Sequence, residues 1–87
     1  MKIVLTKHAI EKIERFRKNK IIITKENILK AINNPEHVDR NSDKPKIITS
    51  KTLNERLVLR VVYKEEGDII KVITFYPAKK GRYYESN

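Results

Sequence analysis

Three runs rich in β-branched and aromatic residues follow one another in the second half of the chain, with only short breaks between them. The runs cover residues 46–51, 56–64 and 69–76, and the breaks contain Asn54 and Gly67. Strands that are joined by such short turns pair with each other antiparallel. The sequence therefore predicts an antiparallel meander as the centre of the fold.

Two short helices are predicted before this meander, after a β-prone run at residues 3–5. Thr6 and Thr24 each offer a hydroxyl group as a helix N-cap. Apolar residues then recur at helical spacing, through about Arg17 in the first helix and up to Asn34 in the second, where Pro35 disfavours further helix. The order β-α-α-β-β-β predicts an α+β fold, in which a two-helix hairpin packs on one face of a mainly antiparallel sheet.

The length of the chain and the motifs that it lacks argue against a multidomain protein, a membrane protein and a metal- or cofactor-dependent enzyme. A chain of 87 residues is expected to form one domain, with a core so small that a homodimer or a tight partner would help to stabilise it. It contains no cysteine, and no apolar run approaches the ~18 residues of a membrane span. We expect a cytoplasmic protein that does not enter a membrane. No glycine-rich phosphate loop or His-x-x-x-His pair is present, so no cofactor and no metal are expected.

The chain is strongly basic. Twenty Lys and Arg stand against 11 Asp and Glu, which gives a formal net charge of +9. Such an excess favours polyanions, above all nucleic acid, as partners. The alternative is that the lysines only keep a small protein soluble.

One expected face of the meander carries the candidate binding residues. If Glu65 lies opposite Asp68 across the last turn, alternation places Leu59, Val61, Thr74 and Tyr76 on the helix-packed face. The opposite, open face then mixes cations with apolar side chains: Arg56, Val58, Arg60, Val62, Ile69, Lys71, Ile73 and Phe75.

This mixture suggests two uses for the open face. We expect its cations, Arg56, Arg60 and Lys71, to hold phosphates. An exposed apolar patch typically marks an interface. We therefore expect a partner, a second copy or the C-terminal tail to cover Val58, Val62, Ile73 and Phe75.

Two further segments carry candidate residues. The tail from about residue 78 is predicted to be flexible and basic, and its cations and aromatics would hold a phosphate and stack a base: Lys79, Lys80, Arg82 and Tyr83. The alternative is a frayed end. Lys7 and His8 open the first helix, where cations oppose the helix dipole, a conflict that a bound phosphate would relieve. We expect His8 to carry a proton during catalysis, the alternative being a packing role. Residues 38–45 are predicted to form an exposed loop, and His37, just before them, to be a surface loop residue.

Four segments resemble a family of uncharacterised small proteins that begin with a His-Ala helix and end in a Val-Thr-x-Tyr-Pro strand. They are residues 8–13 (HAIEKI), 34–38 (NPEHV), 59–63 (LRVVY) and 72–77 (VITFYP). That family in turn resembles the BrnT and RelE/ParE toxins of type II toxin–antitoxin modules. Lys12 departs from the pattern, because relatives often carry Arg there.

The resemblance implies that residues 1–87 form a single RelE/BrnT-like domain with ribonuclease activity. Such an enzyme cuts mRNA, free or bound to the ribosome, without a metal, and a cognate antitoxin protein silences it. Arg60 and the Arg82-Tyr83 pair match in type and region the residues that RelE-like enzymes use. Two other functions fit the sequence: a nucleic-acid-binding module without catalysis, and a basic subunit that binds an acidic protein partner.

Overall fold

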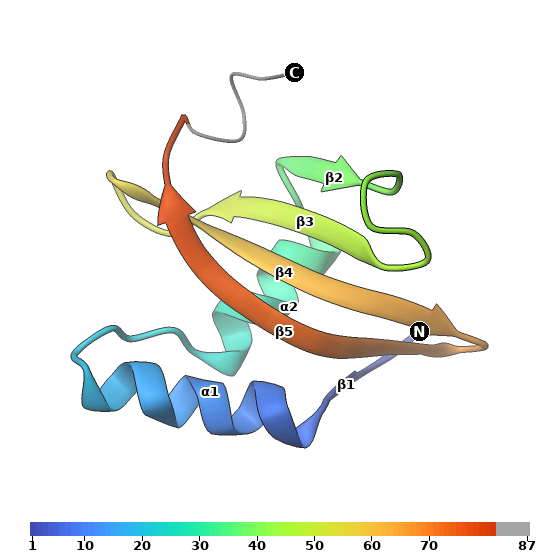
Figure 1. The fold of residues 1–87 in the computed structure, drawn as a ribbon, viewed down its shortest axis with the longest axis horizontal. Helices are drawn as coiled ribbons and strands as arrows, with labels where there is room; N and C mark the ends of the chain where they lie inside the picture. The colour runs from blue at the N-terminus through green and yellow to red at the C-terminus, as the bar shows by residue number, and fades with distance from the viewer. Residues whose placement is uncertain (82–87) are drawn as a thin grey trace.

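The computed structural model describes residues 1–81, which form one mixed sheet and two helices. In chain order the elements are β1 (Lys2–Leu5), α1 (Lys7–Lys18), α2 (Lys25–Asn33), β2 (His37–Asp39), β3 (Ile47–Thr52), β4 (Leu57–Glu66) and β5 (Ile69–Lys79). The strand order across the sheet is β1-β5-β4-β3-β2 (Figure 1). All neighbours are antiparallel except β1 and β5, so the expected α+β class with a mainly antiparallel sheet is confirmed.

Both helices begin at the predicted threonines. Thr6 Oγ1 accepts a hydrogen bond from the backbone N–H of Ala9 at 3.2 Å, and Thr24 Oγ1 accepts one from Asn27 at 3.1 Å. The Asn27 side-chain oxygen in turn accepts a hydrogen bond from the Thr24 backbone N–H at 2.9 Å, which completes a reciprocal capping box. The caps therefore fix where each helix enters the fold.

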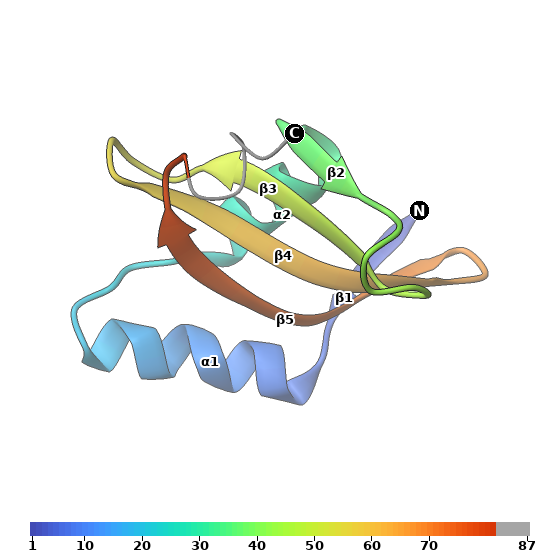
Figure 2. The ribbon, with the colours of Figure 1, turned by 45° about the horizontal axis from the view of Figure 1, so that its top comes forward.

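The two helices lie differently against the sheet. In Figures 1 and 2, α2 crosses behind β3 and β4, whereas α1 runs along the side of β5. β1 pairs only with the first part of β5, from Ile69 to Val72, and the chain then continues directly into α1. The second half of β5 is therefore bordered by a helix, which places side chains of α1 next to Thr74 and Tyr76.

The main core lies between the sheet and the helices, and Phe75 is part of it. Phe75 is fully buried, and its ring centroid lies 5.9 Å from that of Phe16 on α1. The prediction that Phe75 lies on the open face is therefore wrong. The other buried members are Ala9, Ile23, Ile28, Ala31, Ile32, Ile47, Leu59, Val61, Tyr63, Ile70 and Val72.

A β-bulge in β5 explains the error. Tyr63 pairs with Val72, while the preceding residue Val62 pairs with Thr74, so Ile73 is an extra residue without a partner opposite. An extra residue shifts the alternation of side chains by one position from there on. Thr74 and Tyr76, predicted on the helix-packed face, consequently lie on the open face.

The turn register and the polar loop also differ from prediction. Glu66 rather than Glu65 closes the last turn, paired with Ile69, and Gly67 takes the left-handed conformation with φ 59°. Residues 37–39, expected at the edge of a loop, form β2, where His37 pairs with Ser50 and Asp39 with Ile48. Sequence patterns do not reveal so short an edge strand, because it is held by its partner β3 rather than by its own residues.

The last strand is longer than predicted. β5 continues through Lys79, and the backbone N–H of Lys80 donates to the carbonyl oxygen of Arg56 at 2.8 Å. Ala78 and Lys79 therefore belong to the sheet and not to a flexible tail. Arg82 and Tyr83 lie outside the described residues. Within residues 1–81, neither helix has the length and apolar character needed to cross a membrane.

Candidate functional site

A row of four polar residues crosses the open face from β2 to β5. His37 pairs with Ser50, Ser50 with Arg60, and Arg60 with Tyr76. Residues directly opposite each other in antiparallel strands project from the same face of the sheet. The predicted position of Arg60 on the open face is confirmed, and His37 belongs to this row rather than to a loop.

Arg60 occupies the middle of the row and is held by its neighbours. The residue is only 9% exposed. Its Nε donates to the Tyr76 hydroxyl oxygen at 3.0 Å, and its Nη1 donates to Ser50 Oγ at 3.3 Å. The guanidinium carbon also lies 5.8 Å from the centroid of the Tyr76 ring. A permanently charged, planar group is thus fixed in orientation at the centre of the open face.

Two residues of α1 extend the row beyond β5. Lys12 Nζ donates to Thr74 Oγ1 at 3.1 Å, and His8 Nε2 lies 3.3 Å from the same oxygen. His8 and Lys12 are neighbours on the helix surface because they are four residues apart. The hydroxyl of Thr74 therefore holds a lysine and a histidine side by side at the border between α1 and β5.

Lys12 lies among aromatic rings. Its Nζ is 5.6 Å from the ring centroids of Phe16 and Phe75 and 5.9 Å from that of Tyr76. Partial burial, and then the positive charge of Arg15, lower the pKa of the Lys12 ammonium below its usual value. Such a lysine gives up a proton more readily than an exposed one.

These side chains form one continuous constellation, here called the polar strip: His8, Lys12, Ser50, Arg60, Thr74 and Tyr76. Lys12 and Arg60 both lie within 6 Å of the Tyr76 ring centroid. His37 lies farther out, three strand spacings or roughly 14 Å from Tyr76 along the sheet. The strip thus places two cations and an imidazole on one face, within the reach of a bound phosphodiester.

Asp39 lies on the same side of the sheet, but its carboxylate hydrogen-bonds the turn that follows β2. Its carboxylate accepts hydrogen bonds from the backbone N–H groups of Asn41 at 2.9 Å and Ser42 at 3.0 Å, and from the Ser42 hydroxyl. The hydrogen bonds from Ser42 and Asn41, with a smaller effect of the Arg60 charge, lower the pKa of Asp39 to about 2. The carboxylate is therefore an anchor for the loop after β2.

This anchor predicts a specific pH dependence of stability. The pKa of Asp39 is about 2 in the folded protein, against an ordinary value of 3.8. The carboxylate therefore contributes fully to the free energy of unfolding when the pH is above 3.8, and this contribution is lost as the pH falls through about 2. Asp39→Asn keeps one acceptor oxygen but does not titrate. We expect the urea midpoint of the wild type to fall more steeply than that of the variant between about pH 5 and about pH 2. Parallel curves would show that the carboxylate does not stabilise the loop.

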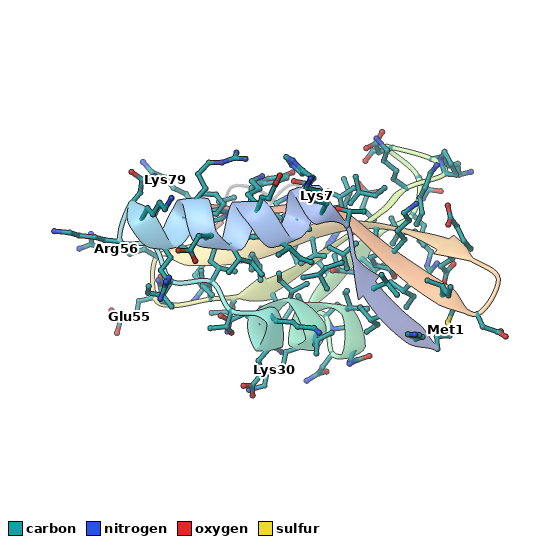
Figure 3. The ribbon with its side chains drawn as sticks, turned by 90° about the horizontal axis from the view of Figure 1, so that it is seen from below. Met1, Lys7, Lys30, Glu55, Arg56 and Lys79 are labelled. Atoms are coloured by element: carbon teal, nitrogen blue, oxygen red, sulfur yellow. The ribbon has the colours of Figure 1, made fainter. Side chains whose placement is uncertain are left out.

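Further cations lie at both ends of β5. Lys64 and Lys71 are directly opposite each other on the open face, a like-charge pair that is unfavourable without an anion. At the other end, Leu57 pairs with Lys79 and the Lys80 amide contacts Arg56, and Figure 3 shows the Arg56 and Lys79 side chains at the same end of the molecule. From Lys71 to Lys79 the strand spans roughly 26 Å. Together with the polar strip, Lys64, Lys71 and Arg56 form a basic track on the open face, whereas Lys79, opposite Leu57, projects from the helix-packed face.

The predicted partner interface is not an exposed patch. Val58 and Val62 lie on the open face but are only 1% and 6% exposed. They belong to β4, the middle strand, so side chains of two neighbouring strands flank them. Ile73 is half-buried in the bulge, and Phe75 lies in the main core. Ile69, another apolar residue predicted on the open face, is exposed.

Sequence patterns did not reveal Lys12, Ser50, Thr74 and Tyr76 as site residues. One signal was available for Lys12, because it lies one helical turn after His8. Thr74 and Tyr76 were assigned to the wrong face, since no sequence pattern indicates the bulge at Ile73. Lys7 lies where expected, exposed at the start of α1 (Figure 3).

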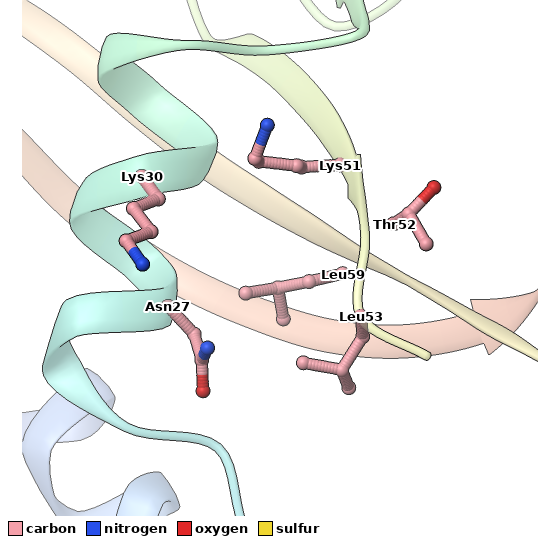
Figure 4. A pocket seen from close by; sticks show the side chains of 6 residues that line it. All are labelled: Asn27, Lys30, Lys51, Thr52, Leu53 and Leu59. Carbon is pink, nitrogen blue, oxygen red and sulfur yellow. The ribbon is translucent and has the colours of Figure 1, made fainter. Parts of the chain in front are cut away.

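A separate pocket of about 230 Å³ lies between α2 and the end of β3. Figure 4 shows Lys30 and Lys51 on its two sides, above Leu59. Both ammonium groups are engaged, because Lys51 Nζ donates to the carbonyl oxygen of Asn34 at 3.0 Å and Lys30 Nζ lies 3.5 Å from the Glu26 carboxylate. We therefore expect this pocket to bind an anion more weakly than the polar strip does.

Within residues 1–81, no three His, Cys, Asp or Glu side chains are grouped as metal ligands would be. In comparisons with known proteins, no family model, no curated protein and no solved structure matches this chain.

Proposed function

We propose that the open face binds single-stranded RNA and that the polar strip cuts it without a metal ion. The observation that carries the proposal is the convergence of His8 and Lys12 from α1 with Arg60 from β4 around Thr74 and Tyr76. Fixed cations stabilise the charge that grows on a phosphate under attack, and an imidazole transfers protons near neutral pH. The strip offers both kinds of group on one face.

The groups fit an attack of the RNA 2′-hydroxyl on the adjacent phosphorus. His8 accepts the hydroxyl proton as the new bond between the 2′ oxygen and phosphorus forms. The Lys12 ammonium, whose pKa is lowered by burial, donates a proton to the 5′ oxygen as its bond to phosphorus breaks. Arg60 stabilises the negative charge on the non-bridging oxygens. The products are a 2′,3′-cyclic phosphate and a 5′-hydroxyl end.

In the cell we propose that this ribonuclease acts as the toxin of a type II toxin–antitoxin module. The resemblance of residues 8–13, 34–38, 59–63 and 72–77 to BrnT- and RelE-like toxins supports this role, and Arg82 and Tyr83 stay proposed contributors to it. Expression alone should arrest growth and leave cleaved transcripts, and co-expression of a neighbouring gene for a small acidic protein should restore growth. Normal growth with intact transcripts would contradict the toxin role.

A second candidate function is binding of nucleic acid without cleavage. The basic track supports it, because Lys64, Lys71 and Arg56 would give affinity for a phosphate backbone whether or not the strip reacts. The two functions differ in one readout. A binding module loses affinity when its cations are removed but never yields a cleaved product.

Both functions predict a salt-dependent affinity that involves Lys71. Removal of one phosphate contact releases one counterion fewer, so Lys71→Ala should weaken RNA binding and flatten the slope of log affinity against log salt by about one unit. The matched control is Lys30→Ala, since Lys30 lies on α2 behind the sheet (Figures 3 and 4). Fluorescence anisotropy with labelled single-stranded RNA measures both slopes. Equal slopes for Lys71→Ala and the wild type would place the RNA elsewhere.

A further inference from the structure

The outer edge of β1 borders a hollow in the surface of this protein. A groove of about 530 Å³ runs along the whole strand, and its lining is mostly apolar. α1 contributes Ile10 and Ile13 to one wall, and Lys25 stands at the start of α2. Figure 3 looks onto this side of the molecule, where β1 runs from Met1 towards Lys7. The groove lies apart from the polar strip.

The backbone of β1 has hydrogen-bonding capacity on the groove side. β1 pairs with β5 through bonds such as Lys2 N–H to the Asp68 carbonyl oxygen and Thr6 N–H to the Val72 carbonyl oxygen, at 3.0 and 3.1 Å. Backbone groups of a strand point alternately to its two sides. The amides of Ile3 and Leu5 therefore point away from β5, where residues 1–81 provide no further strand. An extended peptide could pair with them.

The two edges of the sheet differ in how they are protected. β2, at the far edge, has three residues and is bordered by Pro35, Glu36 and Arg40, features that discourage further strand pairing. β1 carries the sequence Lys-Ile-Val-Leu, and Val4 and Ile10 beside it are exposed. Ile10 is 57% exposed. An unprotected edge next to exposed apolar side chains is the pattern of a peptide-binding edge.

The positive charge around the groove indicates which kind of peptide it would bind. Lys2 and Lys25 border the groove, and the chain as a whole carries a net charge of +9. A second copy of this chain would bring the same excess of positive charge to the contact, which opposes self-association. An acidic segment would instead be attracted to the lysines.

We infer that the β1 groove binds an extended, acidic segment of a partner protein, which adds a strand to the sheet at β1. Alternate apolar side chains of the segment would contact Ile10 and Ile13, while its carboxylates would meet Lys2 and Lys25. The Ile3 and Leu5 backbone groups would supply the pairing hydrogen bonds. This surface operates whether or not the polar strip cuts RNA.

The test uses a synthetic eight-residue peptide of alternating glutamate and valine, with lysine–valine as its charge-reversed counterpart. We expect saturable binding of the acidic peptide only, with slower hydrogen exchange at the Ile3 and Leu5 amides. Ile10→Glu should weaken binding by about tenfold or more, because it removes an apolar contact and adds a like charge. Ile22→Glu is the matched control, since Ile22 is 60% exposed but lies outside the groove, and it should bind as the wild type does.

Three results would overturn the inference. One is no binding of the acidic peptide, and a second is equal binding to the Ile10→Glu and wild-type proteins. The third comes from sedimentation of the full chain without peptide: a dimer that Ile10→Glu dissociates and Ile22→Glu does not would assign the groove to a second copy. RNA cleavage by Ile10→Glu, measured in parallel, should equal that of the wild type, so the outcome is independent of the polar strip.

Discussion

Replacement of His8 by glutamine is expected to slow RNA cleavage by about a hundredfold or more, the usual share of general acid–base catalysis. Glutamine preserves the approximate size of the side chain and its ability to hydrogen-bond Thr74, but it does not take up a proton. His8 is exposed at the start of α1, so the substitution should leave the fold intact. RNA affinity should change little, because Lys12, Arg60 and the basic track still hold the phosphates.

The chain offers a matched control for this experiment in its other histidine. His37 belongs to the same cross-strand row but lies on β2, away from Thr74, so His37→Gln should cleave at close to the wild-type rate. The measurement is single-turnover cleavage at saturating protein, with thermal melting of each variant. Equal rates for His8→Gln and the wild type would exclude His8 from the chemistry. A large drop in the melting temperature of His8→Gln would instead indicate a packing role.

Replacement of Arg60 by glutamine is expected to lower both the rate of RNA cleavage and the stability of the fold. Removal of one fixed group that stabilises the reacting phosphate costs roughly a hundredfold to a thousandfold in rate. The substitution also leaves the hydroxyl groups of Ser50 and Tyr76 without their donor, which should lower stability by about 1–3 kcal/mol. Rates must therefore be compared well below the melting temperature of the variant.

Two variants separate these effects. Tyr76→Phe removes the hydroxyl that orients Arg60 but keeps the ring, so it should reduce the rate less than Arg60→Gln does. Arg56→Gln removes an exposed guanidinium at the end of the basic track and should lower affinity without a large change in the saturated cleavage rate. Equal losses of the saturated cleavage rate in Arg56→Gln and Arg60→Gln would contradict the proposal that Arg60 stabilises the reacting phosphate.

Much of the fold was predictable because local signals agree with the tertiary contacts. Thr6 and Thr24 cap the helices as their side chains suggest, Pro35 follows the end of α2, and the breaks at Asn54 and Gly67 separate the last three strands. The register after Val72 was not predictable. The bulge at Ile73 is stabilised by tertiary contacts, since it allows Phe75 to pack against Phe16 and Tyr76 to hydrogen-bond Arg60.

The candidate site was predictable only in part for the same reason. Arg60 lies on β4, which contains no extra residue, so simple alternation placed it correctly on the open face. Tyr76 lies after the bulge, so the same rule placed it on the wrong face. Lys12 was treated as a departure from a family pattern, and its contact with Thr74 depends on how α1 borders β5.

The most direct test of the central claim is cleavage of a defined RNA by the purified 87-residue chain in the presence of a metal chelator. Single-turnover reactions, with and without ribosomes, would be analysed for the chemistry of the product ends. We expect fragments with a 2′,3′-cyclic phosphate and a 5′-hydroxyl, and no cleavage where a single 2′-deoxy nucleotide replaces the one before the cut. Intact RNA under both conditions, or cleavage of the 2′-deoxy substrate, would contradict the proposed chemistry of the polar strip.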